Sequence, residues 1–181
     1  MQPANGDSYL QGVPLVSITA EEVTPLAIEG GEEPLAFRYQ QDMMVWTKRY
    51  QEAESLADSD MVFVGYGIVA PEYDWNDYEG LDVEGKTVVI LVNDPGFASG
   101  DTELFNGRAM TYYGRWTYKY EEAARQGAAG ALIVHETEAA GYPWLVVSGS
   151  WSGEQFDLDL GDAAPPRVAI EGWLTGEAAR S

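Results

Sequence analysis

The segment Thr87–Val92 (Thr-Val-Val-Ile-Leu-Val) constrains the fold more than any other part of the chain. It is rich in strand-favouring residues with no polar and apolar alternation, which predicts a strand covered on both faces. A helical pattern follows, with Trp116 and Tyr120 on one face and Gly127 placed to end the helix. A second apolar run, Ala131–Val134, comes next. We therefore predict a βαβ unit: a strand, a crossover helix and a parallel strand.

Shorter apolar runs predict further elements around this unit. We expect additional strands at Val13–Thr19, Met61–Val64, Leu145–Ser148 and Arg167–Ile170. Pro14 restricts the first of these to a sheet edge or a strand start. Other segments stay open: Glu21–Pro34 is a hairpin or a loop, Asp42–Gln51 is a strand or an irregular arm, and Glu171–Arg180 is compatible with the start of a helix.

Composition excludes several classes of function. The 181 residues carry 30 acidic and 10 basic side chains, a formal net charge of -20, and such a surface repels nucleic acid and anionic lipid. The absence of Cys excludes disulfides and thiolate metal sites. No apolar run reaches the length of a membrane span, and the polar start Met1–Asp7 lacks the apolar core of a signal peptide.

The motifs that could carry catalysis are weak. Gly65–Ala70 fits a loose dinucleotide-binding pattern, but Pro71 and an acidic loop follow where a helix N-terminus is needed, so we expect a bend. A catalytic zinc site usually takes two or more imidazoles, and His135 is the single histidine of the sequence. Ser148–Gly153 offers hydroxyl groups without a nucleophile motif, and the acidic loops match no EF-hand register. We predict no catalytic residue and no metal ligand in this chain.

The segment Arg108–Lys119 is the candidate binding surface, because basic and aromatic residues gather there on an otherwise acidic chain. One interpretation is a rim that meets a carboxylate or a peptide backbone. The candidate residues of that rim are Arg108, Tyr112, Tyr113, Arg115 and Trp116. The other interpretation is a loop held by internal pairs between arginines and acids that leads into an ordinary amphipathic helix, since arginine suits both uses.

Several stretches of the chain resemble bacterial zinc aminopeptidases that carry a protease-associated insertion. The central segments are Val62–Ile68, Pro71–Tyr73, Trp75, Asp77–Tyr78, Gly80, Asp82–Val83, Gly85–Val89, Asn93–Phe97, Leu104–Ala124 and Gly127–Glu138. Gly6–Tyr9, Val13–Leu15 and Ile170–Trp173 continue the resemblance toward both ends. Glutamate-carboxypeptidase-like enzymes and transferrin-receptor-like proteins are more distantly similar.

The resemblance implies an α/β (α+β) fold of the swivelling β/β/α protease-associated type, with small mixed sheets, flanking helices and one βαβ unit. It implies an N-terminal arm with opening strands over residues 1–57 and a domain core over residues 58–181. In such enzymes the domain lies beside the active site, where it shapes substrate access or holds partners. It carries no catalytic residues itself.

Further expectations follow from the same resemblance. The chain would hold no cofactor, and zinc would belong to a catalytic peptidase domain outside it. That domain, and a peptide substrate, would be its partners, with no nucleic acid and no membrane span. An exported parent enzyme implies a periplasmic or extracellular location. The alternatives are a free-standing module that binds peptides or proteins through Arg108–Trp116 and a self-contained hydrolase.

Overall fold

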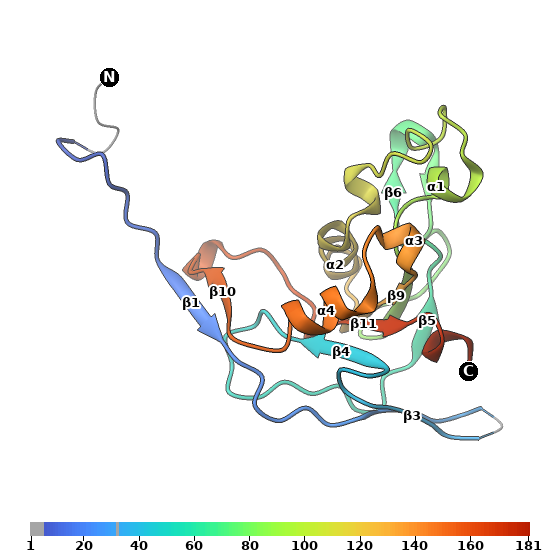
Figure 1. Ribbon diagram of the computed structural model, residues 1–181, viewed down its shortest axis with the longest axis horizontal. Helices are drawn as coiled ribbons and strands as arrows, with labels where there is room; N and C mark the ends of the chain where they lie inside the picture. The colour runs from blue at the N-terminus through green and yellow to red at the C-terminus, as the bar shows by residue number, and fades with distance from the viewer. Residues whose placement is uncertain (1–5, 32) are drawn as a thin grey trace.

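The computed structural model describes residues 6–31 and 33–181, and its centre is one mixed sheet (Figure 1). The five strands lie in the order β4-β11-β9-β8-β5, with β4 antiparallel to β11 and the other neighbours parallel. Their bounds are Met43–Trp46 for β4, Met61–Phe63 for β5, Thr87–Leu91 for β8, Gly130–His135 for β9 and Ile170–Thr175 for β11. The protein is thus of mixed α/β class, as predicted, with smaller two-stranded sheets beside the main one.

The predicted βαβ unit is confirmed. Strands β8 and β9 are parallel neighbours in register from Thr87↔Gly130 to Leu91↔Val134, and helix α2 (Trp116–Arg125) lies between them in sequence. The side chain of Ile90, in the middle of β8, is completely buried. Gly127 follows the helix with a φ of +81°, a left-handed conformation that favours glycine.

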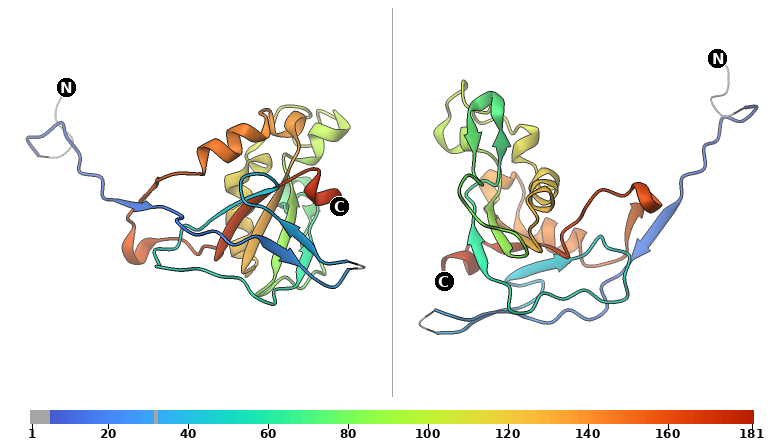
Figure 2. Two further views of the ribbon diagram at one scale, coloured as in Figure 1. Left: turned by 60° about the horizontal axis from the view of Figure 1, so that its bottom comes forward. Right: turned by 180° about the vertical axis from the view of Figure 1, so that it is seen from behind.

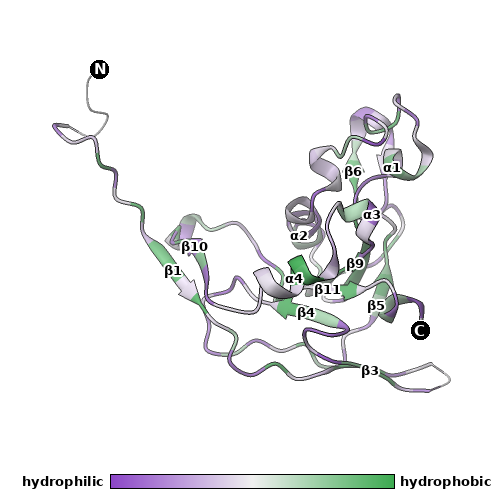
Figure 3. Cartoon of the chain, in the orientation of Figure 1, coloured by the Kyte–Doolittle hydropathy of each residue, from purple (hydrophilic) through white to green (hydrophobic). Residues whose placement is uncertain are grey.

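Two layers cover the sheet. Helices α2, α3 (Thr137–Ala140) and α4 (Trp144–Ser150) lie over one face, where Tyr120 and Val147 belong to the same buried core as Ile133. The hairpin of β2 (Leu26–Ile28) and β3 (Leu35–Phe37) lies on the opposite side in both views of Figure 2. Colouring by hydropathy shows the sheet strands among the most hydrophobic parts of the chain (Figure 3). The open segment Glu21–Pro34 therefore contains β2 and leads into β3, with Glu32 outside the described residues.

A two-stranded ribbon stands apart from this body (Figure 1). It consists of β1 (Leu15–Ile18) and β10 (Gln155–Leu158), which pair antiparallel. Strand β1 lies within the predicted segment Val13–Thr19 and, as Pro14 indicated, pairs on one side only. The ribbon is fastened to the body by an ion pair of 2.8 Å between Arg167 and Asp157.

The remaining elements form a smaller aromatic layer near the carboxyl ends of β5 and β8. They are β6 (Val69–Ala70), β7 (Trp75–Asn76), α1 (Pro95–Ser99) and short 3-10 turns at Pro71–Tyr73 and Tyr112–Gly114. Two further 3-10 turns lie elsewhere, at Gly161–Ala163 after β10 and at Ala178–Arg180 after β11. Phe105 is completely buried there and packs on Tyr73, Trp75 and Tyr113. This layer fixes the long loop that precedes α2.

Two of the predicted strands need correction. Leu145–Ser148 is helical, since both edges of β9 are already paired with β8 and β11, and α4 instead buries Val147 and leaves Leu145 77% exposed. Of the predicted strand Arg167–Ile170, only Ile170 belongs to β11, and the open segment Glu171–Arg180 begins with the rest of that strand, Glu171–Thr175. Strand β11 forms here because it pairs with β4 on one side and β9 on the other. Gly172 permits this close pairing, since a side chain at that position would meet the carbonyl oxygen of Met44.

Two further predictions concern the edge strand and the N-terminal segment. The apolar run Met61–Val64 is typical of a buried strand, but β5 is an edge strand and Phe63 is 60% exposed. Strand β4 comes from residues 1–57 and joins the main sheet, so the open segment Asp42–Gln51 begins as a strand. The polar start Met1–Asp7 falls largely outside the described residues. No helix within residues 6–31 and 33–181 is long and apolar enough to cross a membrane.

Candidate functional site: an aromatic cleft

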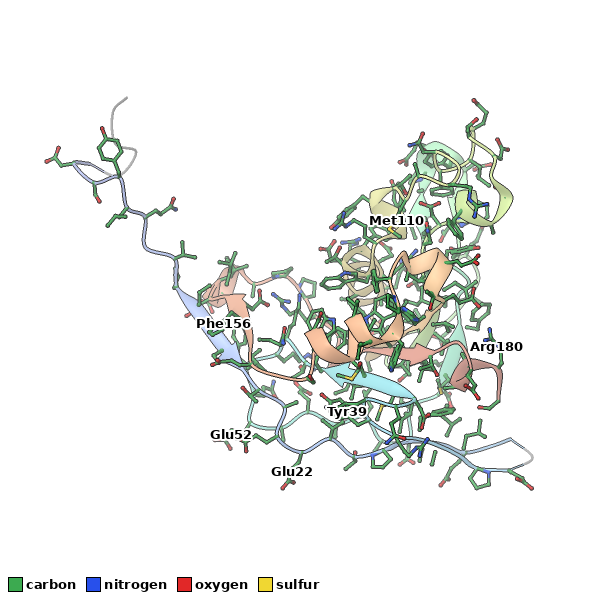
Figure 4. All side chains as sticks on the ribbon, viewed as in Figure 1. Glu22, Tyr39, Glu52, Met110, Phe156 and Arg180 are labelled. Atoms are coloured by element: carbon green, nitrogen blue, oxygen red, sulfur yellow. The ribbon has the colours of Figure 1, made fainter. Side chains whose placement is uncertain are left out.

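A cleft opens where the ribbon meets the body of the protein. It is walled by the end of β4, the start of α2, the residue after α4 and the two strands of the ribbon. Its lining residues are Ile18, Trp46, Thr47, Lys48, Trp116, Trp151, Gln155, Phe156 and Asp157. Phe156, labelled in Figure 4, marks the ribbon side of the cleft.

Three tryptophans give the cleft its character. The rings of Trp46 and Trp151 are stacked, with centroids 3.9 Å apart and planes inclined by 2°. Trp116 meets Trp151 edge-on, at 5.2 Å and 86°. Tyr120 supports Trp46 from below in another edge contact of 5.8 Å. Trp46 is buried whereas Trp116 and Trp151 are half-buried, so the latter two offer aromatic surface to a ligand.

The position of Trp46 follows from the sheet register. Trp46 is the last residue of β4 and lies opposite Glu171 of β11. Its Nε1 donates a hydrogen bond of 3.0 Å to Glu171 Oε2, and Glu171 is only 4% exposed. Burial raises the pKa of Glu171 above its ordinary value, while the charge of Lys48 and the bond from Trp46 act in the opposite direction. A polar contact thus holds the indole at the floor of the cleft.

The charges around the cleft leave one cation without a close acidic partner. Asp157 is neutralised by Arg167 at 2.8 Å. The amine of Lys48 lies 5.7 Å from the centre of the Trp116 ring. Within the described parts of the chain, no carboxylate oxygen lies within 4.0 Å of that amine. The cleft therefore combines aromatic surface with one available positive charge.

The size of the cleft sets what it can hold. Its volume is about 190 Å³. Pockets for complete small molecules commonly measure about 300–1,000 Å³. The cleft suits one side chain of a larger ligand rather than a whole cofactor.

The structure separates the residues predicted to form one binding rim. Trp116 lines the cleft, and Arg115 beside it is exposed. Tyr112 donates a hydrogen bond of 2.9 Å to Glu121 on the outside of α2. The guanidinium of Arg108 lies 4.9 Å from the ring centre of Phe97, at the base of the long loop.

Tyr113 belongs to the buried aromatic layer rather than to the cleft. Its hydroxyl donates a hydrogen bond of 2.6 Å to Glu72, and that bond is the main reason why its pKa rises to about 12. Its ring meets Phe105 and Tyr118 edge-on. Tyr113 thus joins the long loop to the segment after β6.

The basic residues near α2 also have structural roles. Arg125 pairs with Glu122 at 2.8 Å and reaches Glu121 at 3.9 Å. Lys119 is completely buried and its Nζ donates a hydrogen bond of 2.6 Å to the carbonyl oxygen of Tyr66. Burial lowers the pKa of Lys119 to about 7, against the opposing charges of Asp77 and Asp94.

The motifs set aside in the sequence lie away from the cleft. Gly65 and Gly67 have φ values of +59° and +61°, and the chain bends there into β6 and a 3-10 turn. His135 ends β9 and is buried, with its Nε2 atom 3.0 Å from the carbonyl oxygen of Tyr142. A second hollow of about 350 Å³ lies beside His135 and Arg180. No group of three or more His, Asp or Glu side chains that could hold a metal ion occurs among the described residues.

Sequence reasoning missed most of the cleft. Trp46 lies in the segment Asp42–Gln51, whose structure the sequence leaves open, and Trp151 lies in Ser148–Gly153, whose pattern draws attention only to its hydroxyl groups. Lys48 gave no signal, because its importance depends on the distance between β4 and α2. The number of tryptophans was the available hint, since the chain contains six.

Comparison with known proteins identifies no relative: no family model, no curated protein and no solved structure matches this chain.

Proposed function

We propose that this chain is a non-catalytic, protease-associated accessory domain of an exported zinc aminopeptidase, and that its aromatic cleft holds a side chain of a bound peptide. The observation that carries the binding role is the cleft itself. Trp116 and Trp151, which are in edge contact with each other, both line a space of about 190 Å³ beside the amine of Lys48. Aromatic rings with a polar margin are typical of surfaces that hold peptides.

The link to aminopeptidases rests on the residue resemblance described above. The βαβ unit of β8, α2 and β9 is consistent with it, as is the mixture of small sheets with helices. In this proposal zinc and the catalytic groups belong to the peptidase domain of the parent enzyme. The location is periplasmic or extracellular because the parent enzyme is exported.

The ribbon offers a contact surface for that peptidase domain. Leu15, Phe156 and Leu158 lie on one side of the ribbon and are 55%, 63% and 46% exposed. Exposed apolar strips of this kind often mark contacts with other protein surfaces. The alternative proposal is a free-standing peptide-binding module, which uses the same cleft without a catalytic neighbour.

A peptide titration tests the binding role. Calorimetry with a mixture of short peptides rich in aromatic residues should give saturable binding to the wild-type chain. Trp116→Leu should weaken binding by about tenfold, the effect of losing about 1.4 kcal/mol of aromatic contact. Arg115→Ala is the matched control, because Arg115 is exposed and lies next to the cleft without lining it. Equal binding by both variants and the wild type would place the site elsewhere.

The coding sequence on either side of this chain tests the parentage. The aminopeptidase proposal requires a neighbouring reading frame, continuous with this one, that encodes the zinc-binding His, Asp and Glu residues. A stop codon directly after Ser181 would favour the free-standing module.

A further inference from the structure

The ribbon of β1 and β10, which stands apart from the body of the protein (Figure 1), has two long edges, and the protein itself satisfies only one of them. Among the described strands, β1 pairs with β10 alone. We propose that the free edge of β1 is a docking site for an extended segment of another protein, which adds to the ribbon as a third strand. This inference goes beyond the proposed function, because it concerns the edge of the ribbon and not the cleft.

The pairing pattern of the ribbon fixes which backbone groups of β1 point outward. The amide of Asp159 donates a hydrogen bond of 3.0 Å to the carbonyl oxygen of Pro14, directly beyond the last residue pair of the ribbon. Bonded and non-bonded pairs alternate in an antiparallel ladder, so the N–H and C=O groups of Leu15 and Ser17 point away from β10. Within residues 6–31 and 33–181, these four backbone groups have no hydrogen-bond partner.

The opposite edge of the ribbon is covered by the protein. The same alternation points the backbone groups of Phe156 and Leu158 outward from β10. The carbonyl oxygen of Leu158 accepts a hydrogen bond of 2.7 Å from the hydroxyl of Tyr50, and its N–H group donates one of 2.9 Å to Asp157 Oδ1. The structure therefore blocks the edge of β10 and leaves the edge of β1 open.

The side chains of the ribbon favour an added strand. Strand β1 has the sequence Leu-Val-Ser-Ile, without the charged residue that commonly prevents pairing at a sheet edge. Leu15, Phe156 and Leu158 share one face of the ribbon and are exposed. A ribbon of two strands is only marginally stable by itself, whereas three strands with an apolar face are stable. A third strand with apolar side chains on that face would satisfy the open backbone groups and cover the exposed side chains together.

The charge around the ribbon selects the kind of partner. Glu154 and Asp159 flank β10, Glu21 and Glu22 follow β1 by a few residues, and all four side chains are exposed. The chain as a whole has a net charge of -20, so a second copy would be repelled. A strand with basic residues at its ends would instead be attracted. The favoured occupant is therefore an apolar strand with basic ends that belongs to a different protein.

Three capped seven-residue peptides test this inference by calorimetry on the full chain. The first alternates valine and threonine between two terminal lysines. The second is the same peptide with two consecutive central amide nitrogens methylated, which removes a donor from each of its edges. The third has glutamates in place of the lysines. We expect the first to bind about tenfold more tightly than the methylated peptide, because backbone hydrogen bonds are lost. We expect a similar advantage of about tenfold over the acidic peptide at low salt, which declines as salt is added.

Two variants of Ser17 connect binding to the edge of β1. Ser17→Pro removes an outward N–H group and spares the ladder to β10, and it should weaken binding of the lysine peptide by about tenfold. Ser17→Ala is the matched control and should bind like the wild type, since it loses only the hydroxyl bond to Glu154. Both variants should keep the binding of aromatic peptides, because Ser17 does not line the cleft.

Hydrogen exchange measured by nuclear magnetic resonance locates the bound strand. The amides of Leu15 and Ser17 should exchange rapidly in the free protein and slowly with the lysine peptide bound. Equal affinities of the lysine peptide and its methylated form, binding without slower exchange at these amides, or no binding would overturn this inference. Slow exchange at both amides in a dimer of the free chain would also overturn it, by assigning the edge to a second copy. Each of these results leaves peptide binding in the cleft unaffected, and if Ser17→Pro does not fold, the methylated peptide and the exchange rates still decide.

Discussion

The Nε1 atom of Trp46 donates a 3.0 Å hydrogen bond to the carboxyl group of Glu171, across the antiparallel pair of β4 and β11. This bond joins the floor of the aromatic cleft to the main sheet. It also places a carboxyl group where water is largely excluded, because Glu171 is 4% exposed. The stability of the sheet and the shape of the cleft therefore depend on the same contact.

The ionisation of Glu171 should make stability depend on pH. The pKa of Glu171 in the folded protein is raised above 4.5. The contribution of Glu171 to the free energy of unfolding is therefore fully present below pH 4.5 and is lost as pH rises through the folded-state pKa. As pH rises over this range, the wild type should lose stability relative to Glu171→Gln, which keeps a hydrogen-bond acceptor for Trp46. Urea unfolding of both proteins between pH 4 and pH 7.5 measures the difference. Parallel curves would show that Glu171 does not titrate abnormally.

Removal of the acceptor has a different effect. Glu171→Ala should lower the free energy of unfolding by about 1–3 kcal/mol at neutral pH, because the Trp46 N–H group is left buried without a partner. Glu171→Gln is its matched control and should be close to the wild type or more stable, since a buried charge is replaced by a neutral group. Chemical denaturation at a single pH distinguishes these outcomes, and equal stabilities of the two variants would contradict the role of the bond.

Lys119 should produce the opposite pH trend. Its pKa falls from 10.5 in the unfolded chain to about 7 in the folded protein. The cost of burying the charged amine is present in full below pH 7 and declines as pH rises toward 10.5. Between pH 7 and pH 9 the wild type should gain about 2 kcal/mol relative to Lys119→Met. Paired denaturation curves test this, and a constant difference between the proteins would refute it.

The sheet order predicts which strand tolerates a charge. Ile90 in β8 is completely buried, whereas Phe63 in the edge strand β5 is 60% exposed. Ile90→Asp should unfold the domain. The free-energy cost of an unpaired buried carboxylate is comparable with the whole free energy of unfolding of a typical domain, about 5–15 kcal/mol. Phe63→Asp should fold and change stability far less. Circular dichroism melts measure both, and cooperative melting of Ile90→Asp near the wild-type temperature would argue against the strand order.

The stacked pair at the cleft should contribute to stability as well as to binding. Trp151→Ala removes the 3.9 Å stack on Trp46 and the edge contact with Trp116. We expect a loss of about 1–2 kcal/mol in unfolding free energy, since the ring is only half-buried. Leu145→Ala on α4 is the control and should be neutral, as Leu145 is 77% exposed. Thermal melts of the two variants give the comparison.

The sequence predicted the parts of the fold in which local pattern and tertiary environment agree. Val88–Val92 and Ala131–Val134 are continuous apolar runs at the centre of the sheet, so their pattern was sufficient to predict β8 and β9. Leu145–Ser148 has a similar apolar character, but both sides of β9, the strand that precedes it in sequence, are already paired with β8 and β11, and it forms a helix instead. Strand pairing depends on the other strands present, which a single segment does not reveal.

The candidate site was harder to predict from the sequence, for a related reason. The predicted rim of Arg108, Tyr112, Tyr113, Arg115 and Trp116 lies within one short stretch of the chain, whereas the cleft combines residues from five elements. Of that rim, Trp116 alone lines the cleft. The pairing of Trp46 with Trp151 spans more than a hundred residues and depends on how the ribbon returns to the body. Such contacts follow from topology rather than from spacing.

Nuclear magnetic resonance of the indole N–H groups tests the central claim most directly. During titration with a tripeptide that ends in phenylalanine, we predict saturable shifts of the Trp116 and Trp151 signals and a smaller shift of Trp46, whose N–H group stays bonded to Glu171. Trp75, in the separate aromatic layer on Phe105, should not move. Unchanged signals of Trp116 and Trp151 at saturating peptide, or a shift confined to Trp75, would contradict peptide binding in the aromatic cleft.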